Sequence, residues 1–137
     1  MPTFDSADEV YKIFGSFLDQ LTKEPDMRPK FVAADTSFLV NYTDPESRIL
    51  VDCTCDPPQV VNDPPADAAA EIKLAMSADD GHRFWLGKLN MTVALAKKQV
   101  KVTGPMGKMM KLLPALRPAF PRYQAYLEAN GYGDKGA

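Results

Sequence analysis

The sequence is poor in the side chains on which most enzymes and metal sites depend. Its 137 residues include one histidine, two cysteines and one tryptophan. His82 lies far along the chain from Cys53 and Cys55, and three such residues are too few for a zinc site. No apolar run approaches the roughly 20 residues that cross a bilayer, and the opening residues, MPTFDSADEV, contain neither a positive cluster nor an apolar stretch for secretion. The sequence therefore predicts a soluble, intracellular protein with no metal and no cofactor.

The two cysteines are expected to be reduced thiols in the core. A single residue separates Cys53 from Cys55, so on a strand their side chains share one face and a disulfide between them is badly strained. Free cysteine is among the residues most often buried.

The remaining composition is that of one globular domain, residues 1–137, with an uneven distribution of charge. The chain is 45% hydrophobic and long enough to bury a sizeable core. Its formal net charge of −2 argues against nucleic acid as a partner. However, residues 1–82 carry 6 Lys and Arg against 16 Asp and Glu, a net −10, whereas residues 83–137 carry 10 against 2, a net +8. The second part is a basic segment on an acidic protein.

The first part of the sequence predicts a helix and then a β-hairpin. Ser6 and Glu9 have the spacing of a capping box, and apolar residues then recur at helical spacing over residues 10–21. Residues 38–55 contain two stretches of strand-like alternation around the turn residues Asp44-Pro45-Glu46-Ser47.

Strands and helices continue to follow one another in the second part. Alternation at residues 72–76 and 100–102 predicts two strands with one face toward water. Ser77 and Asn90 are each placed to cap a helix, and Pro105 suits the first position of a third. These elements predict an α+β architecture in which helices cover the apolar face of one sheet.

No group of residues makes a convincing catalytic site. His82 near Asp79 and Asp80 resembles an oriented base, but acids in the first turn of a helix also simply favour the helix dipole. The glycines of VTGPMGK lack the Walker spacing of a phosphate-binding loop. We therefore expect a protein that is not an enzyme.

The methionines are open to two interpretations. Met106, Met109 and Met110 share a helical stripe with Leu113, and neighbouring elements contribute Met76 and Met91. Methionine adapts to apolar ligands of different shapes. An apolar helical stripe is also the usual face by which a helix packs into a core. The periodicity alone does not decide between a binding site and a core.

An ordered set of motifs adds a family resemblance. Residues 71–90 read EIKLAMSADDGHRFWLGKLN, a strand leading into a Ser/Asp-capped helix and then Gly-Lys-Leu-Asn. Residues 97–112 read KKQVKVTGPMGKMMKL, a basic strand ending in Gly and a helix ending in Lys-Leu. This order resembles the sterol carrier protein 2 (SCP2-like) family of lipid-binding domains, and with the first helix and the hairpin it covers nearly the whole chain.

The resemblance implies a five-stranded, mostly antiparallel sheet whose helices cover one face and enclose a hydrophobic tunnel. The family implies that the tunnel holds a sterol, fatty acid, acyl-CoA or phospholipid and that no residue is catalytic. The expected lining residues are Phe84, Trp85, Leu89, Leu95, Val102, Met106, Met109, Met110, Leu113, Leu116 and Phe120.

The basic segment adds an expectation about membranes. Seven cations are close in sequence to the expected tunnel, where they are placed to contact lipid headgroups, an anionic membrane or a CoA phosphate. They are Lys97, Lys98, Lys101, Lys108, Lys111, Arg117 and Arg122. A solvated charged face is the alternative interpretation.

The leading hypothesis is a non-catalytic, cytoplasmic lipid-binding or lipid-transfer protein, since the final DKGA is not an SKL-type peroxisomal signal. The alternative is an interaction or substrate-presenting subunit that offers a CoA ester or an apolar segment to a partner enzyme. The sequence leaves the lipid and the oligomeric state open, a homodimer included.

Overall fold

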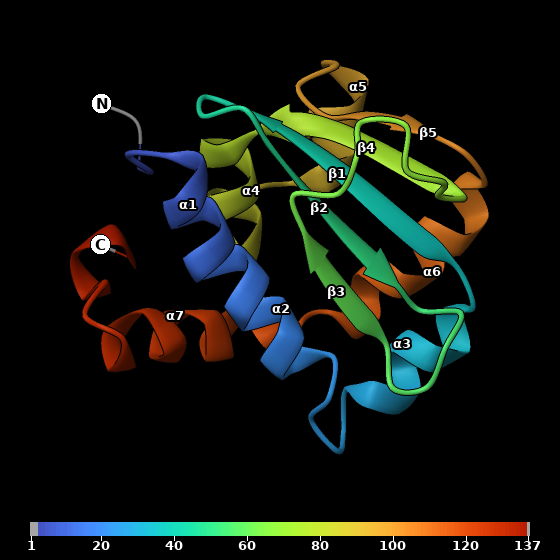
Figure 1. Cartoon of the computed structure of the whole chain (residues 1–137), viewed down its shortest axis with the longest axis horizontal. Helices are drawn as coiled ribbons and strands as arrows, with labels where there is room; N and C mark the ends of the chain where they lie inside the picture. The colour runs from blue at the N-terminus through green and yellow to red at the C-terminus, as the bar shows by residue number, and fades with distance from the viewer. Residues whose placement is uncertain (1–2, 137) are drawn as a thin grey trace.

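The computed structural model describes residues 3–136, and its first element is a helical segment from Ala7 to Leu21 (Figure 1). This segment comprises α1 (Ala7–Val10), the π-helical η1 (Tyr11–Gly15) and α2 (Ser16–Leu21). The Ser6 hydroxyl accepts a hydrogen bond from the Glu9 amide, which confirms the predicted cap. The π-helical stretch was not expected from the apolar periodicity.

The five-stranded sheet has the order β3-β2-β1-β4-β5. Its neighbouring strands are antiparallel except for the central pair β1 and β4, which are parallel with Phe38 opposite Ile72 and Tyr42 opposite Met76. The predicted mostly antiparallel α+β sheet is confirmed. The strands are β1 (Ser37–Thr43), β2 (Ser47–Asp52), β3 (Gln59–Asn62), β4 (Ile72–Ser77) and β5 (Lys101–Thr103).

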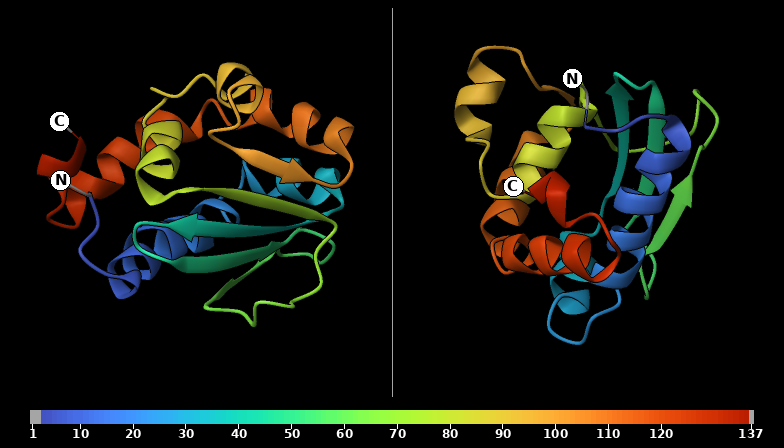
Figure 2. Two further views of the ribbon diagram at one scale, coloured as in Figure 1. Left: turned by 90° about the horizontal axis from the view of Figure 1, so that it is seen from above. Right: turned by 90° about the vertical axis from the view of Figure 1, so that its left-hand side faces the viewer.

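One face of the sheet is covered by helices. Along β4, Ile72, Leu74 and Met76 are buried, whereas Lys73 on the opposite face is exposed. Figure 2 shows α4 (Ala78–Trp85), α5 (Met91–Ala96) and α6 (Met106–Ala115) gathered on one side of the strands in both views. This helix-covered side of the sheet is called the inner face.

The remaining helices close the ends of the structure. α3 (Arg28–Ala34) packs against α6, and α7 (Ala119–Ala129) packs against α2 and α4. A short 3-10 helix, η2 (Gly133–Gly136), follows and contacts α7. The predicted caps are present: the side chain of Ser77 accepts from the Asp80 amide at 3.0 Å, and that of Asn90 from the Val93 amide at 3.2 Å.

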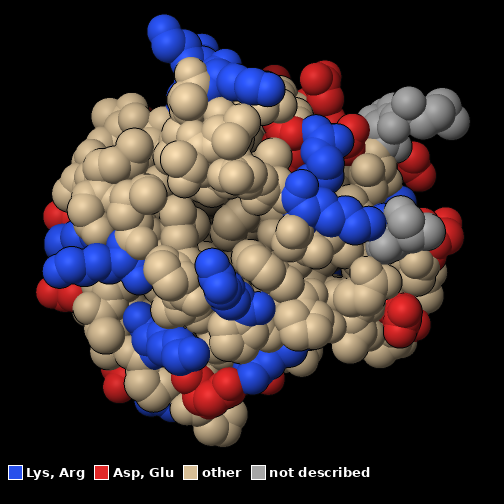
Figure 3. All heavy atoms as spheres, turned by 180° about the vertical axis from the view of Figure 1, so that it is seen from behind, with Lys and Arg blue, Asp and Glu red and all other residues tan. Residues whose placement is uncertain are grey.

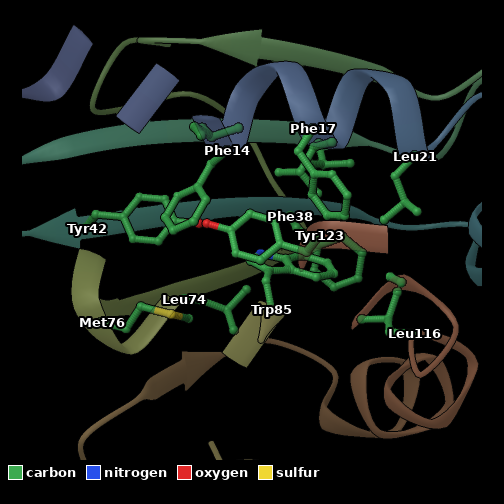
Figure 4. Close-up of a cluster of buried hydrophobic side chains, with 14 of the residues drawn as sticks. Phe14, Phe17, Leu21, Phe38, Tyr42, Leu74, Met76, Trp85, Leu116 and Tyr123 are labelled. Carbon is green, nitrogen blue, oxygen red and sulfur yellow. The ribbon is translucent and has the colours of Figure 1, made fainter. Parts of the chain in front are cut away.

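The centre of the core is aromatic (Figure 4). Phe17 contacts the rings of Tyr123 and Trp85 at centroid distances of 5.0 Å and 5.6 Å, and Phe14 contacts Tyr42 at 5.2 Å. These edge and tilted contacts join α2 and η1 to α4, α7 and β1. These aromatic contacts pack the helices against one another and against the inner face of the sheet.

The expectation that Cys53 and Cys55 lie on the second hairpin strand is wrong. β2 ends at Asp52, whose carboxylate accepts hydrogen bonds from the amide and hydroxyl of Thr54 and so turns the chain out of the ladder. Both thiols are free, and Cys53 is buried while Cys55 is half-buried. Burial raises the pKa of the Cys53 thiol to about 12, so that thiol stays protonated and unreactive.

Candidate functional site

An apolar cavity of about 100 Å³ lies between the inner face of the sheet and the helices. Its strand side is made of alternate residues, because side chains two apart on a strand point to the same face. We call this space the inner cavity. The strand residues that line it are Phe38, Val40 and Tyr42 of β1, Val51 of β2, and Leu74 and Met76 of β4.

The helices supply the other side of the inner cavity. Gly81 brings α4 close to β1, since a Cβ atom on Gly81 would lie only 2.8 Å from Cε1 of Tyr42. Figure 4 shows Trp85 of α4 beside Leu74 of β4, with Leu116 at the other end of the cluster. The helical lining residues are Leu18, Phe31, Gly81, Phe84, Trp85, Met91, Met109, Leu112, Leu113 and Leu116.

The described lining of the inner cavity contains no charged side chain. The most polar group belongs to Tyr42, and burial raises its pKa well above the usual tyrosine range, so it remains neutral. A charge placed in such surroundings would lose its hydration without gaining a partner. The inner cavity is therefore suited to the apolar part of a ligand, at about 25 cal/mol for each Å² removed from water.

A second space, the outer groove, adjoins the inner cavity and has a volume of about 280 Å³. Phe84, Met91 and Leu113 line both spaces and so form a partition between them. These three side chains come from α4, α5 and α6. The other residues of the outer groove are Leu89, Thr92, Met110, Pro114, Arg117 and Phe120.

The structure brings most of the expected lining residues to one or both spaces. Trp85, Met109 and Leu116 line the inner cavity, and Phe84 and Leu113 line both spaces. The outer groove is lined in addition by Leu89, Met110 and Phe120.

Three expected lining residues border neither space. Met106 is 43% exposed at the first turn of α6, so the methionine stripe divides between the inner cavity, the outer groove and solvent. Val102 is half-buried on β5 opposite Leu74, and Leu95 is half-buried on α5.

Sequence reasoning missed the strand residues of the inner cavity. Their alternation was visible, but alternation shows only that two sets of side chains face opposite ways. Whether an apolar face meets a packed helix or an open space depends on the tertiary arrangement. The missed strand residues are Phe38, Val40, Tyr42, Val51 and Leu74, whereas Met76 was among the methionines considered for such a site.

The seven basic residues divide into two groups. Lys108 pairs with Glu71 at 2.9 Å, and Arg122 pairs with Asp26 and, at 3.5 Å, with Glu24. The other five are exposed and make no ion pair within residues 3–136: Lys97, Lys98, Lys101, Lys111 and Arg117.

The charged surface surrounds a hollow. Figure 3 shows that the face opposite to the view of Figure 1 is largely uncharged and hollowed near its centre, with Lys and Arg side chains spaced around the hollow.

In the part of the chain that the structure describes, no helix is both long enough and apolar enough to span a bilayer.

His82 is held within a buried hydrogen-bond network. Its Nε2 lies 2.7 Å from the Lys135 carbonyl oxygen, which can only accept, so Nε2 carries the proton. Its Nδ1 therefore accepts from the Tyr123 hydroxyl at 2.8 Å. Burial is the main cause that lowers the pKa of His82, which keeps the imidazole neutral.

The acids beside His82 are also engaged in structural contacts. Asp79 accepts a hydrogen bond from the Thr3 amide, and Asp80 pairs with Arg83. The partners of these two carboxylates are therefore residues other than His82. Across residues 3–136, no three His, Cys, Asp or Glu side chains are grouped so that they could hold a metal ion.

Comparison with known families and structures gives a consistent result. The model of the SCP-2 sterol transfer family matches residues 14–117 of the chain. No curated protein matches the chain. The fold is similar to that of the sterol carrier protein domain 2 of Helicoverpa armigera, at 18% identity and a TM-score of 0.66 over 82% of this chain and 88% of that one.

Two further solved structures share the fold. Sterol carrier protein 2 from Yarrowia lipolytica, in its apo form, is 16% identical with a TM-score of 0.61 over 82% of this chain and 91% of that one. The ubiquinone synthesis protein UbiJ-SCP2 is 13% identical with a TM-score of 0.56 over 77% of this chain and 94% of that one. At these identities the similarity concerns the fold.

Proposed function

The chain belongs to the SCP-2 sterol transfer family, and on that premise we propose that it is a non-catalytic lipid-binding or lipid-transfer protein. The observation that carries the proposal is the inner cavity, which lies between sheet and helices and has no charged side chain in its described lining. Its proposed ligand is a sterol, a fatty acid or a fatty acyl-CoA. The lipid chain or ring system would occupy the inner cavity and extend through the outer groove as a tunnel.

The site residues follow from this proposal. We propose that Phe84, Trp85, Met109, Leu113 and Leu116 contact the lipid together with the strand residues of the inner face. The expected residues of the outer groove, Leu89, Met110 and Phe120, would contact the part of the lipid nearer to solvent. Residues 1–137 would form one lipid-binding domain, and the free thiols of Cys53 and Cys55 are consistent with a reducing cytoplasm.

Lipid binding is tested with delipidated protein. The lipids that co-purify are extracted and identified by mass spectrometry, and the emptied protein is titrated with a fluorescent fatty acid and a fluorescent sterol. We expect saturable binding of at least one probe at one site per chain. Failure to bind either probe, together with an experimental structure in which side chains fill the inner cavity, would contradict the proposal.

We also propose that the exposed cations contact anionic membranes during lipid exchange. Lys97, Lys98, Lys101 and Lys111 are exposed and make no ion pair within the described residues, and each can contribute about 1 kcal/mol near an anionic surface. Lys108 and Arg122 are already paired and are expected to contribute less. Co-sedimentation with vesicles should therefore increase with phosphatidylserine content and decrease with salt concentration. Binding that depends on neither phosphatidylserine nor salt would refute this role.

A second candidate function is presentation of a substrate to a partner enzyme. Val93, Met106 and Met110 are large apolar residues with 42%, 43% and 40% exposure on α5 and α6, a surface suited to association. The similarity to UbiJ-SCP2, a ubiquinone synthesis protein, is consistent with this alternative. Native mass spectrometry separates the two functions: a monomer with bound lipid favours the carrier, and an obligate complex favours presentation.

A further inference from the structure

We propose that Arg117 binds the carboxylate of a long-chain fatty acid in the outer groove, and that the acyl chain passes the partition into the inner cavity. The inference rests on the proposed lipid-binding function. It selects one ligand class among those that the function allows, and it assigns an orientation and a headgroup residue to it.

The charge of the outer groove favours a fatty acid. Arg117 is the one charged residue in the described lining of the groove, and it is exposed and makes no ion pair within residues 3–136. A guanidinium group matches a carboxylate in shape and charge. A sterol offers no charge to Arg117, and the several phosphate charges of an acyl-CoA would require more cations than this groove supplies.

The lack of charge in the inner cavity fixes the orientation. The carboxylate would lose its hydration among Phe38, Leu74 and Trp85 without meeting a cation. The methyl end carries no charge, so its transfer into the inner cavity removes apolar surface from water and is favourable. The charged end therefore remains in the outer groove, where Arg117 and solvent are both available.

The partition allows the two spaces to become one. The inner cavity, at about 100 Å³, is smaller than the roughly 300–1,000 Å³ of ordinary ligand pockets, and the outer groove adds about 280 Å³. The side chains of Phe84, Met91 and Leu113 line both spaces, and methionine in particular adapts its shape easily. Rotation of these side chains would give an acyl chain room in both spaces.

Trp85 reports the orientation directly. It is the single tryptophan of the chain and lines the inner cavity, and bromine atoms quench indole fluorescence only at close range. The probes are two hexadecanoic acids, one brominated at the methyl end and one beside the carboxylate. We expect stronger quenching by the acid brominated at its methyl end; stronger quenching by the other acid, or equal quenching, would overturn the orientation.

The role of Arg117 is tested by Arg117→Gln with hexadecanoic acid and its methyl ester as probes. The matched control is Lys88→Gln, which removes an exposed cation that lines neither space and has no proposed binding role. We expect Arg117→Gln to weaken binding of the acid about two- to tenfold and to leave the ester unchanged. The control should alter neither probe.

The outcomes distinguish this inference from the function on which it rests. If the wild-type protein binds both probes but Arg117→Gln weakens both equally or neither, the headgroup role of Arg117 is refuted while lipid binding stands. The same holds if Lys88→Gln has the same effect as Arg117→Gln, because the effect would then reflect general surface charge. If the wild-type protein binds neither probe, the proposed function and the inference both fail.

Discussion

His82 and Tyr123 form a buried polar link between α4, α7 and η2. The Tyr123 hydroxyl donates to Nδ1 of His82, and Nε2 of His82 donates to the Lys135 carbonyl. Both side chains are almost completely buried, at 4% and 0% exposure. Loss of either hydrogen bond leaves a partner without water to replace it.

The substitution Tyr123→Phe should therefore be costly. It leaves Nδ1 of His82 buried without a donor, and we expect the free energy of unfolding to fall by about 1–3 kcal/mol. The control is Tyr126→Phe, because the Tyr126 hydroxyl donates to the Lys12 carbonyl at 3.2 Å in an exposed contact. That variant should lose no more than about 1 kcal/mol. Urea unfolding compares the two variants, and equal losses would contradict the buried link.

The same network predicts how stability depends on pH. The folded protein holds the pKa of His82 below the ordinary value of 6.5, so below that pH the unfolded chain binds a proton that the folded protein does not. Stability is therefore complete above about pH 6.5 and falls as the pH drops from there toward the lowered pKa, with a slope of at most about 1.4 kcal/mol per pH unit.

Because His82 is the only histidine, the slope can be assigned to it. Urea unfolding of the wild-type protein and of His82→Gln between about pH 5 and pH 7.5 measures the effect. We expect the slope below about pH 6.5 to be present in the wild-type protein and absent in the variant. A slope that persists in His82→Gln would show that another group titrates.

At the scale of the elements, the turn between β5 and α6 depends on one glycine. Gly104 has a φ of 122°, and a Cβ atom on it would lie 2.3 Å from the Glu71 carbonyl oxygen at the start of β4. Gly107, three residues later in α6, has no atom within 4 Å of the equivalent Cβ position. The two glycines therefore give a matched pair of substitutions.

Gly104→Ala should destabilise the protein by about 1–3 kcal/mol, because the backbone conformation and the Glu71 carbonyl both oppose a side chain. Gly107→Ala should stabilise it by about 0.5–1 kcal/mol, since alanine favours a helix and the space is open. Thermal unfolding of the two variants tests the expected loss of stability in Gly104→Ala and the expected gain in Gly107→Ala. A Gly104→Ala variant as stable as the wild-type protein would contradict the requirement for glycine in this turn.

Elements defined by local signals were predictable from the sequence. The caps at Ser77 and Asn90 and the hairpin turn depend on a few neighbouring residues, and the structure places them as expected. The parallel pairing of β1 with β4 depends on contacts between segments that are distant in the sequence. A single sequence does not reveal such contacts.

The candidate site divides in the same way. The family resemblance predicted Met106, Met109 and Leu113 of one α6 stripe as lining residues. The sequence could not show that Met106 faces solvent while Met109 and Leu113 line the inner cavity. An apolar stripe shows which side chains share one face of a helix. How many of those side chains are buried depends on how much of that face the neighbouring elements cover.

At the scale of the whole molecule, ion pairs join the acidic and basic parts of the chain. Lys108 pairs with Glu71, Arg122 with Asp26, and Lys135 with Glu9. In each pair the cation lies in residues 83–137 and the acid in residues 1–82. Pairs at the surface contribute little individually, at most about 1 kcal/mol, so the packing of the apolar core and not these pairs accounts for most of the stability.

The inner cavity should couple the stability of the whole molecule to lipid binding. Val51 lines the cavity, so Val51→Ile adds a methylene group to unfilled space and should raise the free energy of unfolding of the lipid-free protein by about 0.8 kcal/mol. Val100 is 1% exposed and lines neither space, so Val100→Ile should overpack the core and lower stability by about 1–3 kcal/mol. Urea unfolding without lipid compares the two variants.

The added methylene group in Val51→Ile should also compete with the ligand. Saturation of the wild-type protein with hexadecanoic acid at about 100 times its dissociation constant should add about 2.7 kcal/mol to the free energy of unfolding. Val51→Ile should gain less at the same lipid concentration, because its side chain occupies space that the acyl chain needs. If instead Val51→Ile destabilises the lipid-free protein as much as Val100→Ile does, the space beside Val51 is already filled, and the acyl chain must bind elsewhere.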